Sequence, residues 1–387
     1  MRGDAPGRAG PLAGLKILEM VGIGPAPFCA MMLSDMGAEV VRVHPRNATS
    51  DIPFVNSKFD VLARGRRSIG IDLKNPQGKA LLLDLVARAD GLLEGFRPGV
   101  MERLGVGPAE CLARNERLVF GRMTGWGQEG PLKDRAGHDI DYLALTGLLD
   151  AIGEKDRPPA VPLNLVGDFG GGGLLLAFGM VSAILAARES GKGQVVDAAM
   201  TDGAALLGSM IYGFRAGGGW KSERGANLLD GGAHFYATYL CADGRAVAVG
   251  AIEPKFYRIF LERLGLDAEE WGAQAETGRW PEQKARLAAI FAEKPRDHWT
   301  GLFADCDACV APVLDLDEAM AHPQNLARGT FVEVDGVRQP APAPRFSGTP
   351  TALPEPPSRP GADTDAVLEE WGVEAGRIVE LRRSEAI

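Results

Sequence analysis

The sequence predicts an α/β protein in which a large domain with a parallel sheet is joined to a smaller α+β domain. Short apolar segments suited to strands alternate with segments suited to helices through the first 200 residues. After about residue 213 this alternation gives way to a hairpin followed by helices. The chain has 387 residues, 45% of them hydrophobic, which is enough for two or three domain-sized units.

The first half consists of repeated strand–helix units. We expect strands at residues 15–20, 39–44, 68–73, 91–96, 118–126 and 194–200, and helices at residues 28–37 and 75–88. Asn75 and Pro76 suit the N-cap and first position of the second helix. Helical crossovers between strands are typical of a parallel sheet, so the large domain is predicted to be Rossmann-like. Residues 170–187 are apolar but rich in glycine, which indicates a buried helix and not a membrane span.

The second half predicts the smaller domain and its connections. Residues 235–241 and 245–251 form a predicted antiparallel hairpin, with helices at 281–293 and 296–305. A segment rich in glycine and charge at 214–232 and a proline-rich segment at 336–362 are predicted linkers. The large domain is therefore expected to comprise residues 1–213 and 331–387, with a helical C-terminus docked on it. The small domain is expected to comprise residues 233–330.

Charge and cysteine content exclude several classes of protein. A formal net charge of −9 argues against nonspecific binding to nucleic acid or to an anionic membrane. Five scattered cysteines do not form a disulfide framework, which favours the cytoplasm. Cys306 and Cys309 form a CxxC pair without a second pair, so no metal site is predicted. Residues 1–10 read as a loose leader without a signal-peptide pattern.

The segment GIGPAP follows the first predicted strand. Gly22 and Gly24 match the start of a dinucleotide-binding GxGxxG motif, but Pro27 replaces its third glycine. We therefore expect a tight turn that lets a ligand approach the helix N-terminus, and not an NAD site.

His138 and Asp168 are the candidate acid/base residues. His138 lies in AGHDIDY, at the start of a predicted helix, where a neutral imidazole can act as a base. Asp168 precedes four glycines whose backbone N–H groups are open to a ligand carbonyl. A pair of different acid/base groups suits the removal of a proton from one face of a carbon and its return to the other. Ordinary helix starts explain the same residues, with Asp139 or Asp168 as caps and the glycines serving helix packing.

These residues stand within a much longer set of motifs. They include PLAGLKILEM, IDLKNPQG, GFRPGV, RMTGWGQEGP, GHDIDY, LNLVGDFGGG, GKGQVVDAAM, LLDGGAHFYATY, GAIEPKFY and PAPRFS, and they run from residue 11 to about residue 346. In them the chain resembles the α-methylacyl-CoA racemases of the class III CoA-transferase (CaiB/BaiF) superfamily.

The resemblance implies a reaction on 2-methylacyl-CoA thioesters. His138 would remove the C2 proton of one epimer, and protonated Asp168 would return a proton to the opposite face of the enolate. Glu253 would hydrogen-bond His138 from the partner subunit of an interlocked homodimer. CoA is part of the substrate, so no separate cofactor is implied, and the acyl chain is left open.

The resemblance also implies a binding site for the CoA moiety. Ile71, Asp72, Leu73 and Lys74 would border its adenine and ribose. Gly137, His138, Asp139, Ile140, Asp141 and Tyr142 would border the pantetheine and the thioester. Arg97 and Arg103 would lie near the phosphates. Arg46 is displaced by one position from the family's arginine, and Asp141 replaces the family's usual asparagine.

Two other functions fit the same motifs. A class III CoA transferase would use Asp139 as a nucleophile that forms an acyl anhydride. A CoA-binding protein without catalysis would have lost the acid/base pair, both members of which are present here.

Overall fold

The computed structural model describes residues 9–48 and 54–387, so most of the leader predicted at residues 1–10 lies outside the described residues. The chain divides into two compact units. The first runs to Thr146 and also contains residues 163–207 and 327–387, and the second contains residues 147–162 and 208–326. The division differs from the predicted boundaries chiefly at residues 147–162. Arg224 draws this segment to the second unit by donating hydrogen bonds to Asp150 and to the carbonyls of Glu154 and Arg157.

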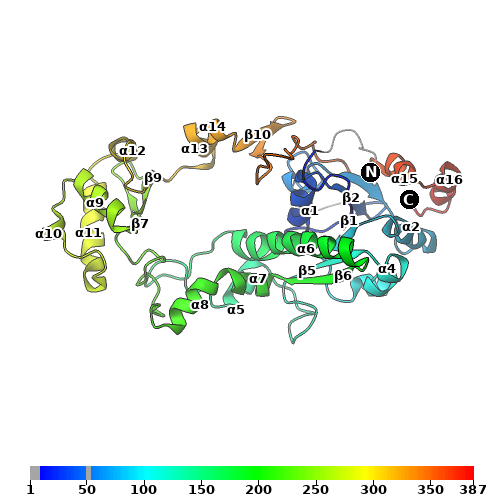
Figure 1. The fold of residues 1–387 in the computed structure, drawn as a ribbon, viewed down its shortest axis with the longest axis horizontal. Helices are drawn as coiled ribbons and strands as arrows, with labels where there is room; N and C mark the ends of the chain where they lie inside the picture. Colours follow the sequence, from blue (N-terminus) through cyan, green and yellow to red (C-terminus); the bar gives the residue numbers. More distant parts are fainter. Residues whose placement is uncertain (1–8, 49–53) are drawn as a thin grey trace. The chain divides into compact units, whose positions relative to one another are not determined.

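The first unit contains a six-stranded parallel sheet (Figure 1). Its strands are β1 (Lys16–Met20), β2 (Glu39–His44), β3 (Arg67–Gly70), β4 (Gly91–Glu94), β5 (Val119–Thr124) and β6 (Gln194–Ala199). Their spatial order is β3-β2-β1-β4-β5-β6, which confirms the Rossmann-like prediction. The order reverses between β1 and β4, and a crevice outside the carboxyl ends of the strands is expected at that point.

Helices cover both faces of this sheet. Helices α1 (Pro25–Asp35) and α6 (Leu175–Ser190) pack on one face, over a core that includes Ile17 and Leu93. Helices α2 (Pro76–Val86), α4 (Pro108–Arg114), α15 (Thr364–Glu370) and α16 (Ala375–Arg383) cover the other face, and α3 (Val100–Leu104) adjoins this core. The N-cap predicted for α2 is confirmed, because the Asn75 side chain accepts a hydrogen bond from the Gln77 backbone N–H at 2.9 Å.

Three segments of the first unit differ from the predictions. The third strand ends at Gly70, so residues 71–73 leave the sheet. The predicted helical C-terminus consists of two helices separated by a turn, because Gly372 has a φ of 75° and ends α15. The proline-rich linker begins later than residue 336, because β11 (Val337–Pro340) pairs with β10 (Phe331–Val334).

The second unit has its own sheet and core. Strands β7 (Tyr236–Leu240) and β8 (Ala246–Gly250) form the predicted antiparallel hairpin, and β9 (Val310–Pro312) adds to it. The helices of this unit are α8 (Ser209–Ala216), α9 (Pro254–Arg263), α10 (Ala268–Trp271), α11 (Trp280–Phe291), α12 (Arg296–Phe303) and α13 (Leu316–Ala321), with α14 (Pro323–Arg328) at the boundary. The core is strongly aromatic, with Phe260 and Phe291 fully buried. Helix α8 occupies the start of the linker predicted at 214–232.

A 26-residue helix combines a π-helical segment, η2 (Leu165–Leu174), with α6. It is long and apolar enough to cross a membrane by length and composition. However, 44% of its most apolar 18-residue stretch is buried inside the protein. Because α6 packs on β5 and β6, one side of this helix serves as part of the core of the sheet domain.

Candidate active site

A cavity of about 400 Å³ lies at the carboxyl edge of the sheet, at the point where the strand order reverses. The loops after β1 and β4 contribute Gly24 and Phe96 to its lining, and the loop after β5 contributes Trp126. His138 and Asp168 both line this cavity, so the structure brings together the two predicted acid/base residues. Gly24 has a φ of 71° and begins α1, as the predicted tight turn requires.

His138 is the N-cap of α5 (Asp139–Leu145). Its backbone N–H donates a hydrogen bond to the Asp141 carboxylate at 2.9 Å, which fixes the start of the helix. The imidazole is exposed and lines the cavity. The ring is therefore accessible to a ligand in the cavity.

Asp168 lies on the first turns of η2, inside the helix and not at an N-cap. The Asn164 side-chain amide donates a hydrogen bond to its Oδ2 at 3.2 Å. Burial raises the pKa of Asp168 most strongly. The Asn164 hydrogen bond lowers it, the neighbouring Asp139 raises it and His138 lowers it, and the net result is a raised pKa. A carboxyl of this kind is easier to protonate than an exposed one.

Asp139 is buried directly behind Asp168. Its side chain is 5% exposed, and its Oδ2 accepts a hydrogen bond from the Asp168 backbone N–H at 2.7 Å. Its Oδ1 has less than 1 Å² of accessible surface. The carboxylate is thus engaged with the backbone of η2 and closed to solvent.

Tyr142 supports the floor of the cavity. Its hydroxyl donates a hydrogen bond to the Gly137 carbonyl at 2.5 Å, and its ring packs edge-on against Trp126. A Cβ on Gly137 would lie 2.8 Å from the Tyr142 ring and 2.9 Å from the Trp126 ring, so only glycine leaves room for both. Burial, with smaller contributions from the carboxylates of Asp168, Asp141 and Asp139, raises the pKa of Tyr142 to about 12, which keeps its hydroxyl protonated.

The glycines after Asp168 form a packing surface. Gly171 lies against the backbone of α7 (Met200–Leu207), and Gly172 and Gly173 lie against Pro25 of α1. This close packing of three helices accounts for the run of glycines, in agreement with the packing alternative. It also fixes the segment that carries Asp168.

The residues predicted to bind CoA are only partly brought together. Arg97, Gly137 and Tyr142 line the cavity with His138. The lining of this cavity does not include Arg46, Ile71, Asp72, Leu73, Lys74, Arg103, Asp139, Ile140 or Asp141. Of these, Arg46 and residues 71–74 lie together at the carboxyl ends of β2 and β3, where Arg46 forms an ion pair of 3.4 Å with Glu385. Asp139, Ile140 and Asp141 are in the first turn of α5, and exposed Arg103 is at the end of α3.

Glu253 lies in the second unit, as the N-cap of α9. The pKa of the Cys309 thiol is raised, first by partial burial and then by the nearby carboxylate of Glu253. Cys306 and Cys309 are both free thiols. Across residues 9–48 and 54–387 the structure contains no cluster of three or more metal-ligating side chains.

Several residues of the site were not predicted from the sequence. Trp126, Lys133 and Arg135 line the cavity, and Asn164 holds Asp168. The contact between Asn164 and Asp168 could have been predicted from their spacing, because side chains four residues apart meet on a helix. The positive charges of Lys133 and Arg135, together with that of Arg97, make this cavity suitable for an anionic ligand.

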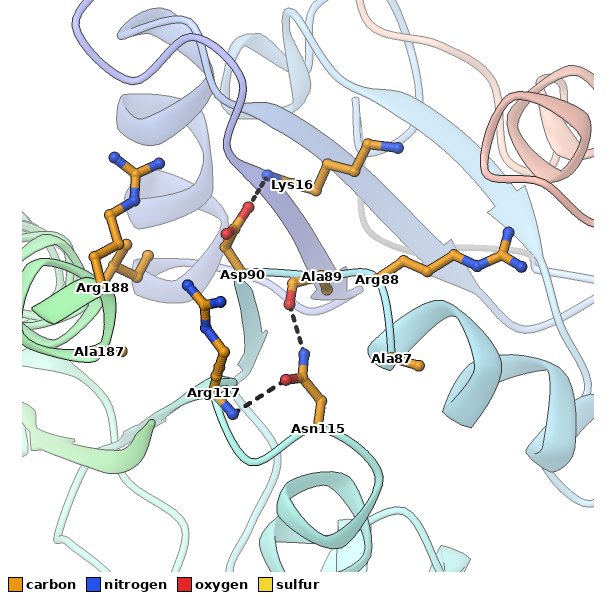
Figure 2. A pocket seen from close by; sticks show the side chains of 10 residues that line it. Lys16, Ala87, Arg88, Ala89, Asp90, Asn115, Arg117, Ala187 and Arg188 are labelled. Carbon is orange, nitrogen blue, oxygen red and sulfur yellow. Dashed lines mark hydrogen bonds between the residues drawn. The ribbon is translucent and has the colours of Figure 1, made fainter. Parts of the chain in front are cut away.

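A second cavity of about 400 Å³ lies at the opposite, amino-terminal edge of the sheet (Figure 2). It is lined by Lys16, Arg88, Arg117 and Arg188 together with Asp90. Figure 2 shows Lys16 and Arg88 extending to one side and Arg188 to the other, so the cations do not converge. Arg88 follows the end of α2 and Arg188 is in the last turn of α6, where positive charge stabilises the carboxyl end of a helix.

Comparison with known proteins agrees with the geometry. The model of CoA-transferase family III matches residues 12–364. The chain is 46% identical to alpha-methylacyl-CoA racemase of Mus musculus over 96% of each chain, and 45% identical to that of Homo sapiens over 97% of each chain. The crystal structure of a CaiB/BaiF family protein from Brucella suis superimposes with a TM-score of 0.80 at 25% identity, covering 94% of this chain and all of that one. A family match over most of the chain, on a sheet whose crevice contains the predicted acid/base pair, leads to one conclusion: the chain belongs to CoA-transferase family III.

Proposed function

We propose that this protein is an isomerase that interconverts the (2R) and (2S) epimers of 2-methylacyl-CoA thioesters. The observation that carries the proposal is the presence of His138 and Asp168 in the lining of one cavity. The 45–46% identity to the two alpha-methylacyl-CoA racemases over nearly the full chain supports the same reaction.

The reaction follows from the acidity of the C2 proton next to the thioester carbonyl. In one direction, neutral His138 takes this proton, and the electron pair of the broken C–H bond forms the enolate. Protonated Asp168 then gives its proton to the opposite face of C2. In the other direction, ionised Asp168 is the base and protonated His138 is the acid. Between two conversions in the same direction, His138 releases its proton to solvent and Asp168 takes one up, which restores the starting state.

The enolate oxygen needs hydrogen-bond donors while the negative charge is on it. The first N–H groups of α5, beginning with that of Asp139, are the donors that we propose, because the first N–H groups of a helix lack partners within it. They stand immediately after His138, so a thioester whose C2 faces the imidazole would have its carbonyl near them. CoA itself would be held by Arg97, Lys133 and Arg135 through its phosphates.

The environment of Asp139 favours isomerisation over CoA transfer. A nucleophilic carboxylate must reach the thioester carbon, but Asp139 is 5% exposed and its Oδ2 is engaged by the Asp168 backbone N–H. Its second oxygen is closed to solvent. Attack by Asp139 would require the start of η2 to move away.

Incubation in D₂O tests the proposal. Either epimer of a 2-methylacyl-CoA should gain one deuterium at C2 and drift to a mixture of epimers. Transfer of CoA from an acyl-CoA to a free acid, together with a hydroxylamine-trapped adduct on Asp139, would instead establish the transferase reaction. Absence of exchange from both epimers in a protein that binds CoA would identify a binding protein without catalysis.

We further propose that the protein is a homodimer. Leu174, Phe178 and Leu185 lie on one face of the long helix, and they are 48%, 71% and 60% exposed. Such an exposed apolar face is typical of a subunit interface. Glu253 of one subunit would then contact His138 of the other.

Mixed dimers test this arrangement. Equal amounts of inactive His138→Ala and Glu253→Ala proteins should regain activity when subunits exchange, because one of the two sites in a mixed dimer has both residues intact. A monomer by light scattering, or no recovery after proven subunit exchange, would exclude the shared site.

A further inference from the structure

Asp139 makes a contact that its own helix does not require. His138 is the N-cap of α5, and Asp141 already closes this cap by accepting the His138 N–H. Asp139 turns inward to a different helix, where its Oδ2 accepts the backbone N–H of Asp168 at 2.7 Å. The first N–H groups of a helix have no partner within it, so α5 supplies an acceptor that η2 lacks.

A neutral side chain could provide this hydrogen bond equally well. The negative charge of Asp139 is buried together with its second oxygen, which has no hydrogen-bond partner among the described residues. Burial of a carboxylate oxygen without a partner costs stability. Gly167 makes the approach possible, because a Cβ at that position would lie 2.8 Å from the Asp139 Oδ2. A charge retained at such a cost, directly behind Asp168, is expected to act on Asp168.

We propose that Asp139 is a positioning residue that anchors Asp168 and places a like charge behind its carboxyl group, so that Asp168 and His138 can share one proton. This inference rests on the proposed racemase function. The reaction alternates between neutral His138 with protonated Asp168 and protonated His138 with ionised Asp168. Both arrangements are populated only if the proton affinities of the two groups are close.

The groups that face Asp168 act in opposite directions. Asn164, on the same helical segment, and His138, on α5, stabilise the ionised carboxylate. Asp139, also on α5, opposes them with a like charge. The Tyr142 hydroxyl stays protonated and adds no charge. Uncharged Gly24, before α1, also faces Asp168, since a Cβ there would lie 3.6 Å from the Asp168 Oδ2. Burial is the largest cause of the raised pKa of Asp168, and Asp139 is the only neighbouring charge among these groups that adds to it.

The variant Asp139→Asn separates charge from position. Its side-chain oxygen can still accept the Asp168 N–H, but the like charge is gone. The pKa of Asp168 should fall, so the acid limb of the pH profile of kcat/KM for epimerisation should move to lower pH. The limb should move equally for the two epimers, because the equilibrium constant of the reaction fixes the ratio of their kcat/KM values. Asp139→Ala also removes the anchor, so it should lower kcat by a further factor of about 10 to 100.

Asp202→Asn is the matched control. Asp202 is exposed on α7, the helix packed against η2, but it is not among the charges that act on Asp168. Its removal should leave the acid limb in place. An unmoved limb in folded Asp139→Asn protein, or an equal shift in Asp202→Asn, would overturn the inference. Asp139→Ser provides a second neutral acceptor if the asparagine variant does not fold.

A direct titration keeps this inference separate from the proposed function. The carboxyl carbon of Asp168 can be followed by ¹³C NMR without substrate, with Asp168→Asn to assign its signal. The titration midpoint should be lower in Asp139→Asn than in the unmodified protein. If the midpoint falls but neither epimer exchanges, the link between the two aspartates stands and the racemase function fails. If the midpoint is unchanged, the inference itself fails.

Discussion

Replacement of Gly171 by alanine is expected to displace Asp168 without a large loss of stability. Gly171 is three residues after Asp168 on η2, and a Cβ there would lie 2.6 Å from the backbone nitrogen of Ala204 and 2.8 Å from the carbonyl carbon of Gly203. Ordinary contacts begin at 3.4 Å, so η2 and α7 must separate by about 0.8 Å. The atoms in conflict belong to the backbone, so no side-chain rotation relieves the contact.

Gly171→Ala is expected to affect the rate of the reaction more than the stability of the fold. Overpacking costs about 1–3 kcal/mol, and alanine regains about 1 kcal/mol through its higher helix propensity. The net loss of stability is therefore expected to be at most about 2 kcal/mol. A displacement approaching 1 Å at a catalytic group can lower the rate by about 100-fold, so kcat should fall by about 10- to 100-fold.

The assay combines C2 deuterium exchange with denaturant unfolding. Gly376→Ala on α16 is the matched control, because a Cβ at Gly376 has no atom within 4 Å and the helical backbone accepts alanine. The control should keep full activity and equal or higher stability. Full activity in Gly171→Ala would refute the claim that tight packing of η2 positions Asp168.

The second unit and the floor of the cavity give two further predictions. Burial lowers the pKa of His234 to about 4, so below the unfolded pKa of 6.5 the unfolded chain binds a proton that the folded chain does not. The second unit should accordingly lose roughly 2–3 kcal/mol of stability between pH 7 and pH 4. In urea unfolding, His234→Asn should remove most of this pH dependence of stability. An equally steep pH dependence in the variant would show that His234 is not its cause. Tyr142→Phe removes the hydrogen bond to Gly137, so a loss of about 1–2 kcal/mol is expected by thermal unfolding together with slower epimerisation. Unchanged stability in this variant would show that the Gly137 carbonyl is satisfied in another way.

Much of the sheet domain could be predicted because its strands and helices have clear sequence patterns. Strand β2 has the predicted bounds of residues 39–44, and Asn75 caps α2 as expected. The C-terminal break could not be foreseen from periodicity alone, since Gly372 also fits inside an apolar helical pattern. The π-helical form of η2 has no sequence pattern of its own and depends on the packing of glycines between α1 and α7.

The candidate site was predictable as a pair of residues but not as an arrangement. The resemblance to known racemases indicated His138 and Asp168, and the strand order explains why they meet at one crevice. The contact between Asp139 and Asp168 joins residues 29 positions apart, and the missing side chain of Gly167 permits it. Local sequence does not show such a contact. In the sequence, Lys133 and Arg135 look like ordinary surface charges. Only the folded loop that carries them shows that they line the cavity.

The central claim is that His138 and Asp168 act on opposite faces of C2, and deuterium exchange by the two single variants tests it most directly. Asp168→Ala keeps one base, so it should exchange the C2 proton of one epimer only, without inverting it. His138→Ala should do the same for the other epimer, and neither variant should epimerise at a measurable rate. Exchange of the same epimer by both variants, or epimerisation at the unmodified rate in either, would contradict the two-base account.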